Sequence, residues 1–269
     1  MQVLIINLAE EKARRDFQKV QMQSLGLNFH FVEAVSASSL DPDEDLEYWN
    51  SWERSLRLSE RACLRSHFEL WKCIGAGTEP VLILEDDALL AQETTTLLPE
   101  IERLSGVDHV NLETRGRRKL VGRKLFKVGS DGQMRRLYQD RSGSAAYILF
   151  PAGARKLVAF AERRAGTADA VICAAYDLMS YQLDPAMAIQ LDQCVAFGIP
   201  TPVRTSSSIG SEPRPQKQTL RQASRRVGAQ LRMLGRQLSV LGLADRRMVK
   251  LSPSFQQNFV NRITCAKPE

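Results

Sequence analysis

Hydrophobic positions near the start of the chain follow first a strand pattern and then a helix pattern. An apolar run over residues 3–8 predicts a strand, and apolar residues at helical spacing over 10–25 predict a helix that ends before Gly26. Residues 29–35 predict a second strand. Because the connections are short, we expect this β-α-β unit to place its two strands side by side and parallel.

The middle of the chain continues the mixture of strands and helices. We expect polar or basic loops over 36–52 and 115–124 and a hairpin over 125–138 that turns at Asp131-Gly132. The other expected elements are helices over 58–74 and 100–104 and from Pro151 onward, and strands over 81–84, 109–112 and 145–150. This mixture predicts an α/β fold, a single Rossmann-type nucleotide-binding domain with a mostly parallel sheet.

The last quarter of the chain has a different composition. Residues 201–219 are rich in Pro, Ser and charge, which predicts a flexible linker. From residue 220 leucines recur at helical spacing with arginines between them, so 220–269 is expected to be a basic amphipathic helical segment. Such a helix either binds an anionic membrane surface through 220–250 or folds back on the domain through Leu231, Leu234 and Leu238.

Charge and cysteine content limit the class of protein. The chain of 269 residues carries a net charge of +6, but residues 212–250 alone hold ten basic and two acidic residues, so the remainder is slightly acidic. A nucleic-acid-binding protein that acts through this tail is one alternative, although the tail lacks interleaved aromatic residues. The five cysteines are scattered and the first residues lack the basic region of a signal peptide, which favours the cytoplasm.

The most informative stretch is Val81–Asp87, where four apolar residues run directly into Glu85, Asp86 and Asp87. Buried carboxylates are costly unless they are paired or bind a cation. Ligands bind at the carboxyl ends of strands in open α/β sheets, and hard oxygen ligands suit Mg²⁺ or Mn²⁺. The stretch therefore favours a metal site for nucleotide phosphates over a solvated helix start.

Three blocks of sequence resemble glycosyltransferase family 25, the lipooligosaccharide-type galactosyl- and glucosyltransferases. They are Ile5–Leu8 followed by Arg14-Arg15, the helix Leu58–Trp71 and the strand Leu82–Asp87. The match covers about residues 1–200 and implies a GT-A-like domain there. It departs from the family pattern at Ala62, where glycine is usual, and before Asp177.

The resemblance implies a metal-dependent, inverting transfer of a hexose from a UDP-sugar to a lipooligosaccharide or related glycan acceptor, with galactose expected before glucose. Asp87 and Glu85 are then the expected ligands of Mn²⁺ or Mg²⁺. The expected base is Asp177, with Glu113 second, although either could be a helix cap. The residues expected to bind the nucleotide sugar are Asn7, Leu8, Arg14, Glu60, Ser66 and Asp86, each of which could instead be structural.

A sugar nucleotidyltransferase is the second alternative, because it would share the nucleotide-binding sheet and the metal carboxylate. The chain has no G-x-x-x-x-G-K phosphate loop, which argues against P-loop enzymes. A glycolipid acceptor would place the enzyme at the inner face of the cytoplasmic membrane.

Overall fold

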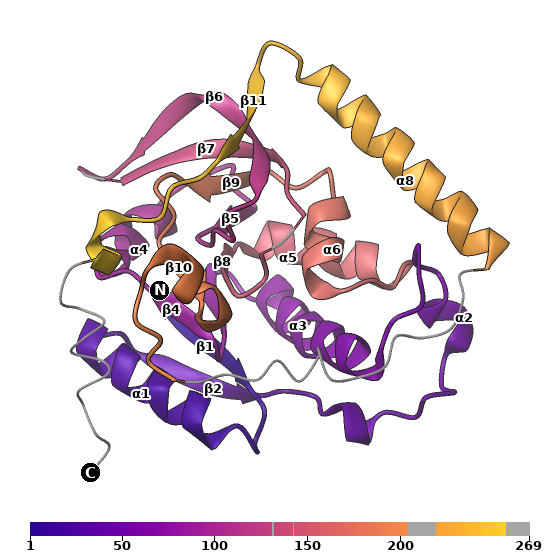
Figure 1. Ribbon diagram of the computed structural model, residues 1–269, viewed down its shortest axis with the longest axis horizontal. Helices are drawn as coiled ribbons and strands as arrows, with labels where there is room; N and C mark the ends of the chain where they lie inside the picture. Colours follow the sequence, from indigo (N-terminus) through magenta and orange to yellow (C-terminus); the bar gives the residue numbers. More distant parts are fainter. Residues whose placement is uncertain (131, 142, 204–218, 257–269) are drawn as a thin grey trace.

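A nine-stranded sheet forms the centre of the protein (Figure 1). The computed structural model describes residues 1–130, 132–141, 143–203 and 219–256. In spatial order the strands are β11 (Ala244–Met248), β6 (Arg118–Val128), β7 (Gly132–Gln139), β9 (Ser180–Leu183), β5 (His109–Asn111), β8 (Ala146–Leu149), β3 (Val81–Glu85), β1 (Gln2–Asn7) and β2 (Phe29–Glu33). A separate pair joins β4 (Ala88–Leu90) to β10 (Ala188–Gln190).

Helices cover both faces of the sheet (Figure 1). The α-helices are α1 (Lys12–Leu25), α2 (Leu46–Trp49), α3 (Leu58–Ala76), α4 (Thr94–Glu102), α5 (Pro151–Ala161), α6 (Ala168–Ala174) and α8 (Leu220–Ser239). Short 3-10 helices are η1 (Ala37–Ser39), η2 (Leu191–Gln193), η3 (Val195–Phe197) and η4 (Pro253–Gln256). None of the helices in the described part of the chain is long and apolar enough to cross a membrane.

Two apolar cores form because alternate strand residues point to opposite faces. Leu82 and Leu84 of β3 pack with α1 and α4, whereas Val81 and Ile83 pack with α3, α5 and α6. The strand β3 is therefore buried on both faces, as its continuous apolar sequence predicts. The result is a three-layer α/β/α arrangement that fixes the position of Asp86 and Asp87, which follow Glu85.

The sheet is mixed. The strand β1 is parallel to β2 and β3, and β5 is parallel to β9, while β8 lies antiparallel between β3 and β5. On the far side β7 is antiparallel to β9 and to β6. Because β8 reverses direction, β1, β3, β5 and β9 all end at the same edge of the sheet.

The first half of the chain follows the sequence prediction closely. The parallel β-α-β start is confirmed, and α1 ends at Gly26, which has φ 64° in the left-handed region. The helix expected over 58–74 is α3, and the α/β class is confirmed. The helix predicted over 100–104 begins earlier, at Thr94, and the predicted loop over 36–52 contains η1 and α2.

The basic stretch 115–124 is the clearest difference. It was predicted to be a loop, but β6 begins at Arg118, and the four residues from Lys119 to Gly122 are all buried. Because the buried Lys119 is charged, the alternation of apolar and polar residues that identifies a strand cannot be recognised in this sequence. The hairpin to β7 is confirmed, although Asp131 of its predicted turn lies outside the described residues.

After residue 219 the chain forms α8 as predicted, and then an unpredicted strand. The strand β11 pairs antiparallel with β6 and becomes the outermost strand of the main sheet. Most of the predicted linker, residues 204–218, and the end of the tail, 257–269, lie outside the described residues. The boundaries of a separate C-terminal unit stay a prediction.

The helix α8 contacts the domain through its polar side. Gln222 is buried and donates to Ser55 Oγ, Arg225 donates to the carbonyl of Asn50, and Gln237 donates to Gln139 Oε1. The apolar residues face outward: Leu231 and Leu238 are 63% and 57% exposed. The alternative in which α8 folds back through Leu231, Leu234 and Leu238 is therefore wrong, because these leucines are exposed.

Candidate active site

The carboxyl ends of β1, β3 and β5 bring polar residues from distant parts of the sequence together. Asn7 ends β1, Glu85 ends β3 and Asn111 ends β5. The strand β8 begins at this edge because it is antiparallel to both β3 and β5. Just before β8, Ala145 N–H donates to Glu113 Oε2 at 3.1 Å. The edge therefore gathers carboxylates from two strand ends, as the acid-rich strand predicts.

Asp86 is held on the side of β1 and α1. Its Oδ2 accepts a hydrogen bond from Asn7 Nδ2 at 2.8 Å, and its Oδ1 forms a 2.9 Å ion pair with Arg14. Burial raises the pKa of Asp86 to about 6, although Arg14 and Asn7 oppose the shift. Of the residues predicted to bind the nucleotide, the structure brings Asn7, Arg14 and Asp86 into direct contact.

Asp87 and Glu113 are the two carboxylates at this edge that have an unsatisfied oxygen. Asp87 Oδ1 and Glu113 Oε1 are buried and accept no hydrogen bond from any residue of the described chain. Burial raises the pKa of Asp87 well above its ordinary value, and the negative charges of Glu85, Asp86 and Glu113 raise it further. Burial also raises the pKa of Glu113 to about 7, against the lowering effect of Lys119.

Glu85 lies on the side of α3. Its Oε1 accepts a 2.7 Å hydrogen bond from Ser144 Oγ and lies 3.3 Å from His67 Nε2. Burial acts to raise the pKa of Glu85, but the bonds from His67 and Ser144 outweigh it, and the pKa lies below its ordinary value. Glu85 is therefore more fully engaged by protein groups than Asp87.

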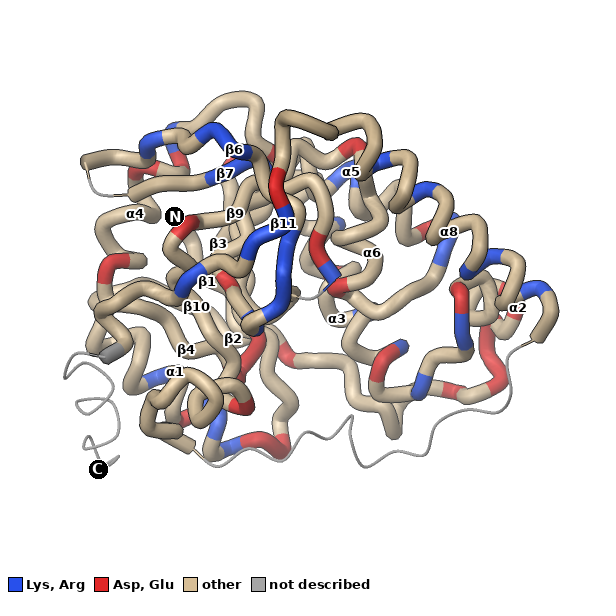
Figure 2. The backbone as a smooth tube through the Cα atoms, turned by 45° about the horizontal axis from the view of Figure 1, so that its top comes forward, with Lys and Arg blue, Asp and Glu red and all other residues tan. Residues whose placement is uncertain are grey.

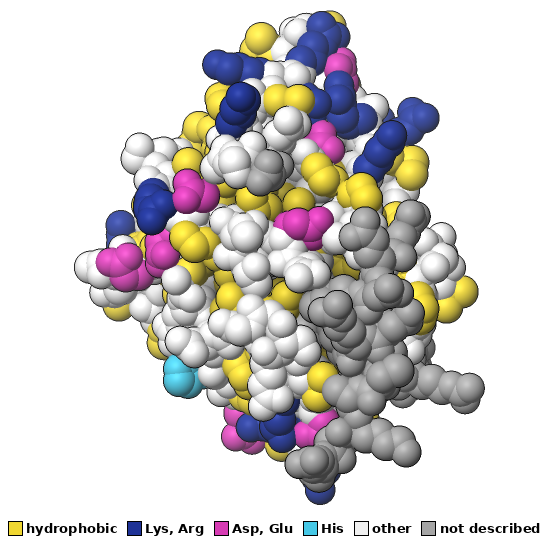
Figure 3. Space-filling model, turned by 90° about the vertical axis from the view of Figure 1, so that its left-hand side faces the viewer, with side chains coloured by type: hydrophobic (Ala, Val, Ile, Leu, Met, Phe, Trp, Pro, Cys, Tyr) yellow, Lys and Arg dark blue, Asp and Glu magenta, His cyan; other side chains and the backbone are white. Residues whose placement is uncertain are grey.

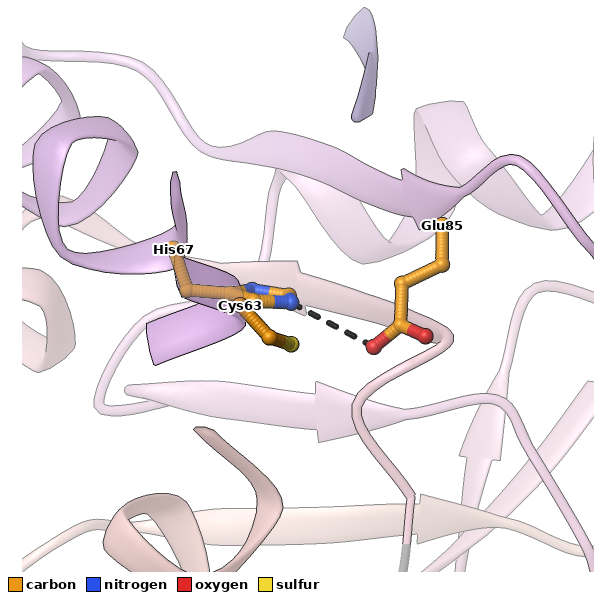
Figure 4. A group of neighbouring side chains, drawn as sticks. All are labelled: Cys63, His67 and Glu85. Atoms are coloured by element: carbon orange, nitrogen blue, oxygen red, sulfur yellow. Dashed lines mark hydrogen bonds and ion pairs between the residues drawn. The ribbon is translucent and has the colours of Figure 1, made fainter. Parts of the chain in front are cut away.

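The ring of His67 is fixed from behind. Its Nδ1 lies 2.8 Å from the hydroxyl of Tyr147, which also accepts a 2.8 Å hydrogen bond from Trp71 Nε1. All three side chains are fully buried. The thiol of Cys63, one turn earlier on α3, points toward the same space as His67 Nε2 and Glu85 (Figure 4).

A buried lysine holds the backbone behind Glu113. Lys119 Nζ donates to Glu113 O at 2.9 Å and to Gln182 Oε1 at 2.7 Å. Gly143 packs against the same residue with φ 120°, and a Cβ there would lie 3.3 Å from Glu113 Oε2 and 2.9 Å from Asn111 Nδ2. A glycine is required at this position because both the space and the backbone conformation exclude a side chain.

Asp169, near the start of α6, is an acid that sequence reasoning missed. Its charge interacts with those of Glu85 and Asp140, and it also acts on the thiol of Cys63. Burial raises its pKa, and hydrogen bonds from Thr167 and Ala170 N–H oppose the shift. An isolated Asp early in a short helix resembles a cap, so only the packing of α6 against α3 shows its position.

Three predicted site residues have structural partners. The Glu60 carboxylate accepts a 2.8 Å hydrogen bond from each terminal guanidinium nitrogen of Arg54, and it accepts from Arg57 N–H at the start of α3. Burial acts to raise the pKa of Glu60, but these bonds hold it below its ordinary value. Ser66 Oγ accepts from Val35 N–H and donates to Ala62 O. The carbonyl of Leu8 accepts from Glu11 N–H at the start of α1.

The structure separates Asp177 from the other acids. It is exposed, and its carbonyl accepts from Lys156 Nζ, which also pairs with Asp108 at 2.6 Å. Asp108 precedes β5, and Asp177 precedes β9, so both lie at the amino ends of these strands. The acids after β3 lie at the opposite edge, so Asp177 does not share their site.

The donor set fits a divalent cation. Two buried carboxylate oxygens without a hydrogen-bond donor, in an acidic cluster that lacks enough positive charge, are the environment that Mg²⁺ or Mn²⁺ occupies in proteins. Arg14 pairs with the neighbouring Asp86, and Lys119 reaches the backbone carbonyl of Glu113, not its carboxylate. Asp87 and Glu113 are therefore two candidate metal ligands, each with a buried oxygen that no described residue bonds.

A three-layer α/β fold with acids at the carboxyl edge of its sheet defines a nucleotide-binding enzyme domain. The model of "Glycosyltransferase family 25 (LPS biosynthesis protein)" matches residues 1–172. The chain belongs to this family and is a glycosyltransferase, which confirms the resemblance inferred from the sequence.

The individual proteins that the chain resembles share low sequence identity with it. The chain is similar to the lipooligosaccharide biosynthesis protein lic2B of Haemophilus influenzae, with 23% identity over 202 residues, 70% of this chain and 76% of the relative. Among solved structures it is similar to an inositol-1-phosphate CTP transferase from T. maritima, with TM-score 0.43, 10% identity and coverage of 72% and 90% of the two chains. A glycosyltransferase involved in glycosylation of the PBCV-1 major capsid has TM-score 0.33, 11% identity and coverage of 59% and 65%.

Proposed function

We propose that this glycosyltransferase moves a hexose from a UDP-sugar to a lipooligosaccharide or related cell-surface glycan, with a divalent metal and inversion at the anomeric carbon. Galactose is the first expected donor sugar and glucose the second. The observation that carries the proposal is the pair of buried, unsatisfied oxygens of Asp87 and Glu113 in the described chain. Family membership and the likeness to lic2B support the class of acceptor.

Asp87 and Glu113 would hold Mn²⁺ or Mg²⁺, and that cation would neutralise charge on the leaving diphosphate. Glu85 stands beside them and adds negative potential, while its Oε1 is engaged by Ser144 and His67. In this proposal Glu113 is a ligand rather than the base expected from the sequence. Its fully buried side chain favours a fixed ligand over a group that must meet an incoming acceptor.

The nucleotide would lie on the side of β1 and α1. Asn7 and Asp86 offer hydrogen-bonding groups to the base and ribose, and the guanidinium of Arg14 suits phosphate oxygens. The backbone carbonyl of Leu8 lies on the same side, at the start of α1, where it accepts from Glu11 N–H. In this arrangement Glu60 and Ser66 support α3 and take no part in binding.

Asp169 is the proposed general base. It is only partly buried, it lies within electrostatic reach of Glu85, and burial raises its pKa, which makes the carboxylate more basic than an ordinary Asp. The carboxylate would accept the proton of the acceptor hydroxyl as that oxygen attacks the anomeric carbon. Asp177 is not retained in this role because it lies at the opposite edge of the sheet.

The outward face of α8 would bind the anionic surface of the inner leaflet. Its apolar stripe is exposed, and Lys and Arg follow α8, β11 and β6 (Figure 2). Lys and Arg side chains also gather at the upper end of the face that lies on the left-hand side of Figure 1 (Figure 3). This docking would bring the enzyme to a lipid-linked acceptor.

The direct test is the release of nucleoside diphosphate from a panel of sugar nucleotides in the presence of Mn²⁺ and a lipooligosaccharide acceptor. We expect release from UDP-galactose or UDP-glucose that stops with EDTA and in Asp87→Asn, whereas Asp16→Asn, at a half-exposed position on α1, behaves as wild type. Full activity of Asp87→Asn or of the EDTA-treated enzyme would overturn the metal assignment. Formation of pyrophosphate would instead indicate a nucleotidyltransferase.

A further inference from the structure

A thiol, an imidazole and a carboxylate converge between α3 and the end of β3, on the side of Glu85 that faces away from Arg14. Cys63 Sγ, a ring nitrogen of His67 and a carboxylate oxygen of Glu85 all lie within 4.8 Å of one another (Figure 4). Cys63 and His67 are four residues apart on α3 and so project from one face of the helix. Glu85 completes the group from a separate element.

We propose that Cys63, His67 and Glu85 form a second metal site, specific for a thiophilic divalent cation such as Zn²⁺. Sulfur, imidazole nitrogen and carboxylate oxygen are the ligands that Zn²⁺ takes, usually four in number. His67 Nε2 and Glu85 Oε1 are already 3.3 Å apart, about the separation of two ligands on one zinc ion. Glu85 retains 23% exposure, so water can supply the fourth ligand.

The groups around this trio are arranged as supports for metal ligands. His67 Nδ1 is fixed by the hydroxyl of Tyr147, which leaves Nε2 directed at Glu85. Glu85 is oriented by the hydroxyl of Ser144. Such outer partners orient ligands and set their affinity for the metal. As the metal–sulfur bond forms, the thiol proton of Cys63 leaves to the buffer, and no oxidant or reductant is needed.

The trio differs in chemistry from Asp87 and Glu113. That pair offers hard oxygens alone, which suit Mg²⁺ or Mn²⁺, whereas a thiolate selects softer ions. Each site therefore has its own preferred metal even though Glu85 borders both. The inference is independent of the proposed transfer reaction, since it rests only on the three side chains and their supports.

Titration of the Asp87→Asn protein with Co²⁺ favours the second site, because the substitution removes one of the two hard-oxygen ligands, and only a site with a thiolate gives the absorption that is measured. Co²⁺ bound to a thiolate gives a sulfur-to-metal charge-transfer absorption. We expect this absorption in Asp87→Asn and in Asp87→Asn/Cys73→Ser, where Cys73 is an exposed cysteine on the same helix. It should disappear in Asp87→Asn/Cys63→Ser, and Zn²⁺ affinity should fall at least about tenfold.

A second measurement does not depend on the folding of a variant. Zn²⁺ should slow alkylation of Cys63 in the wild-type protein at least about tenfold while the exposed Cys73 reacts as before. Absence of the charge-transfer absorption, its persistence after Cys63→Ser, or alkylation of Cys63 unaffected by Zn²⁺ would overturn the proposal. Failure of sugar transfer would change none of these readings, so the two proposals fail separately.

Discussion

Lys119 and Asp140 form a buried ion pair, with Nζ 2.7 Å from Oδ2 and side chains only 1% and 4% exposed. The same ammonium group donates to the carbonyl of Glu113 and to Gln182. Asp140 in turn accepts from Asn111 Nδ2 at 3.2 Å. One lysine thus joins β6, β5 and β9 directly behind the proposed metal ligand.

Loss of this lysine should destabilise the protein strongly. Lys119→Met removes the buried ammonium group of the ion pair and its hydrogen bonds to Glu113 O and Gln182, which we expect to lower the free energy of unfolding by about 3–5 kcal/mol. Urea denaturation measures the change. Lys127→Met, an exposed position on the same strand, is the control and should change stability by less than about 0.5 kcal/mol. A small effect at Lys119 would show that the pair does not hold these strands together.

Substitution of Glu113, a proposed metal ligand, should reduce activity without reducing stability. Glu113→Gln keeps the shape of the side chain and removes a buried charge, so the metal-free protein should unfold no more easily than wild type. Metal-dependent transfer should fall at least about 100-fold. Release of nucleoside diphosphate measures the loss of transfer, denaturation in EDTA measures stability, and calorimetric titration with Mn²⁺ measures metal affinity, with the exposed Glu79→Gln as control. A stable variant with unchanged metal affinity would exclude Glu113 as a ligand.

The two candidate bases can be compared directly. Asp169→Asn cannot take up a proton, and we expect kcat to fall about 10²- to 10⁴-fold with little change in KM for the donor. Asp177→Asn, at the opposite edge, should stay within about twofold of wild type. Steady-state kinetics with saturating metal decides between them. The reverse order of the two losses would restore Asp177 as the base.

His109 should make acid unfolding steeper. Burial, with the charges of Lys119 and Arg136 acting in the same direction and that of Asp108 opposing them, lowers the pKa of His109 to about 3 from an ordinary 6.5. Between these values the unfolded chain binds a proton that the folded chain rejects, so stability falls as the pH falls, by about 1.4 kcal/mol per pH unit.

His109→Leu removes that contribution and two buried ring nitrogens that no described residue bonds. Urea denaturation at pH 7 and pH 4.5 should show a smaller loss in the variant than in wild type, with the exposed His30→Leu as control. Equal losses in wild type and His109→Leu would contradict the burial effect.

The exposed stripe of α8 should control binding to anionic vesicles. In Leu231→Gln/Leu238→Gln two apolar side chains are lost to the membrane, and affinity for phosphatidylglycerol vesicles should fall roughly tenfold or more. Sedimentation with vesicles measures it, with neutral phosphatidylcholine vesicles for comparison. Leu46→Gln, on the exposed surface of α2, is the matched control. Binding that survives the double substitution would assign the interaction to another surface.

The acid strand was predictable because its signal is local. Four apolar residues followed by Glu85-Asp86-Asp87 specify both a buried strand and the chemistry at its end, whatever the rest of the fold. The position of Asn7 and Arg14 beside Asp86 was predictable for a similar reason, since one ends the first strand and the other lies in the helix that follows it. In these places the sequence order and the spatial order agree.

The remaining parts of the site depend on distant packing. Ser144 reaches Glu85 because β8 lies antiparallel beside β3, and Asp169 approaches the site because α6 packs on α3. Neither residue has a distinctive neighbour in sequence. Asp177 was chosen by position along the chain, and the direction of β9 places it at the wrong edge. Lys119 was hidden because a charged residue at an inward position looks like part of a loop.

The pairing of β11 with β6 affects how the tail can be studied. The strand covers the outer backbone groups of β6, which would otherwise form an open edge able to recruit strands from other molecules. Truncation before residue 244 would therefore remove β11, which follows α8 and joins it to the sheet. The same truncation would expose β6 as an unpaired edge strand that promotes aggregation. Aggregation of such a fragment would imitate a loss of membrane affinity, so single substitutions on α8 are the appropriate tools.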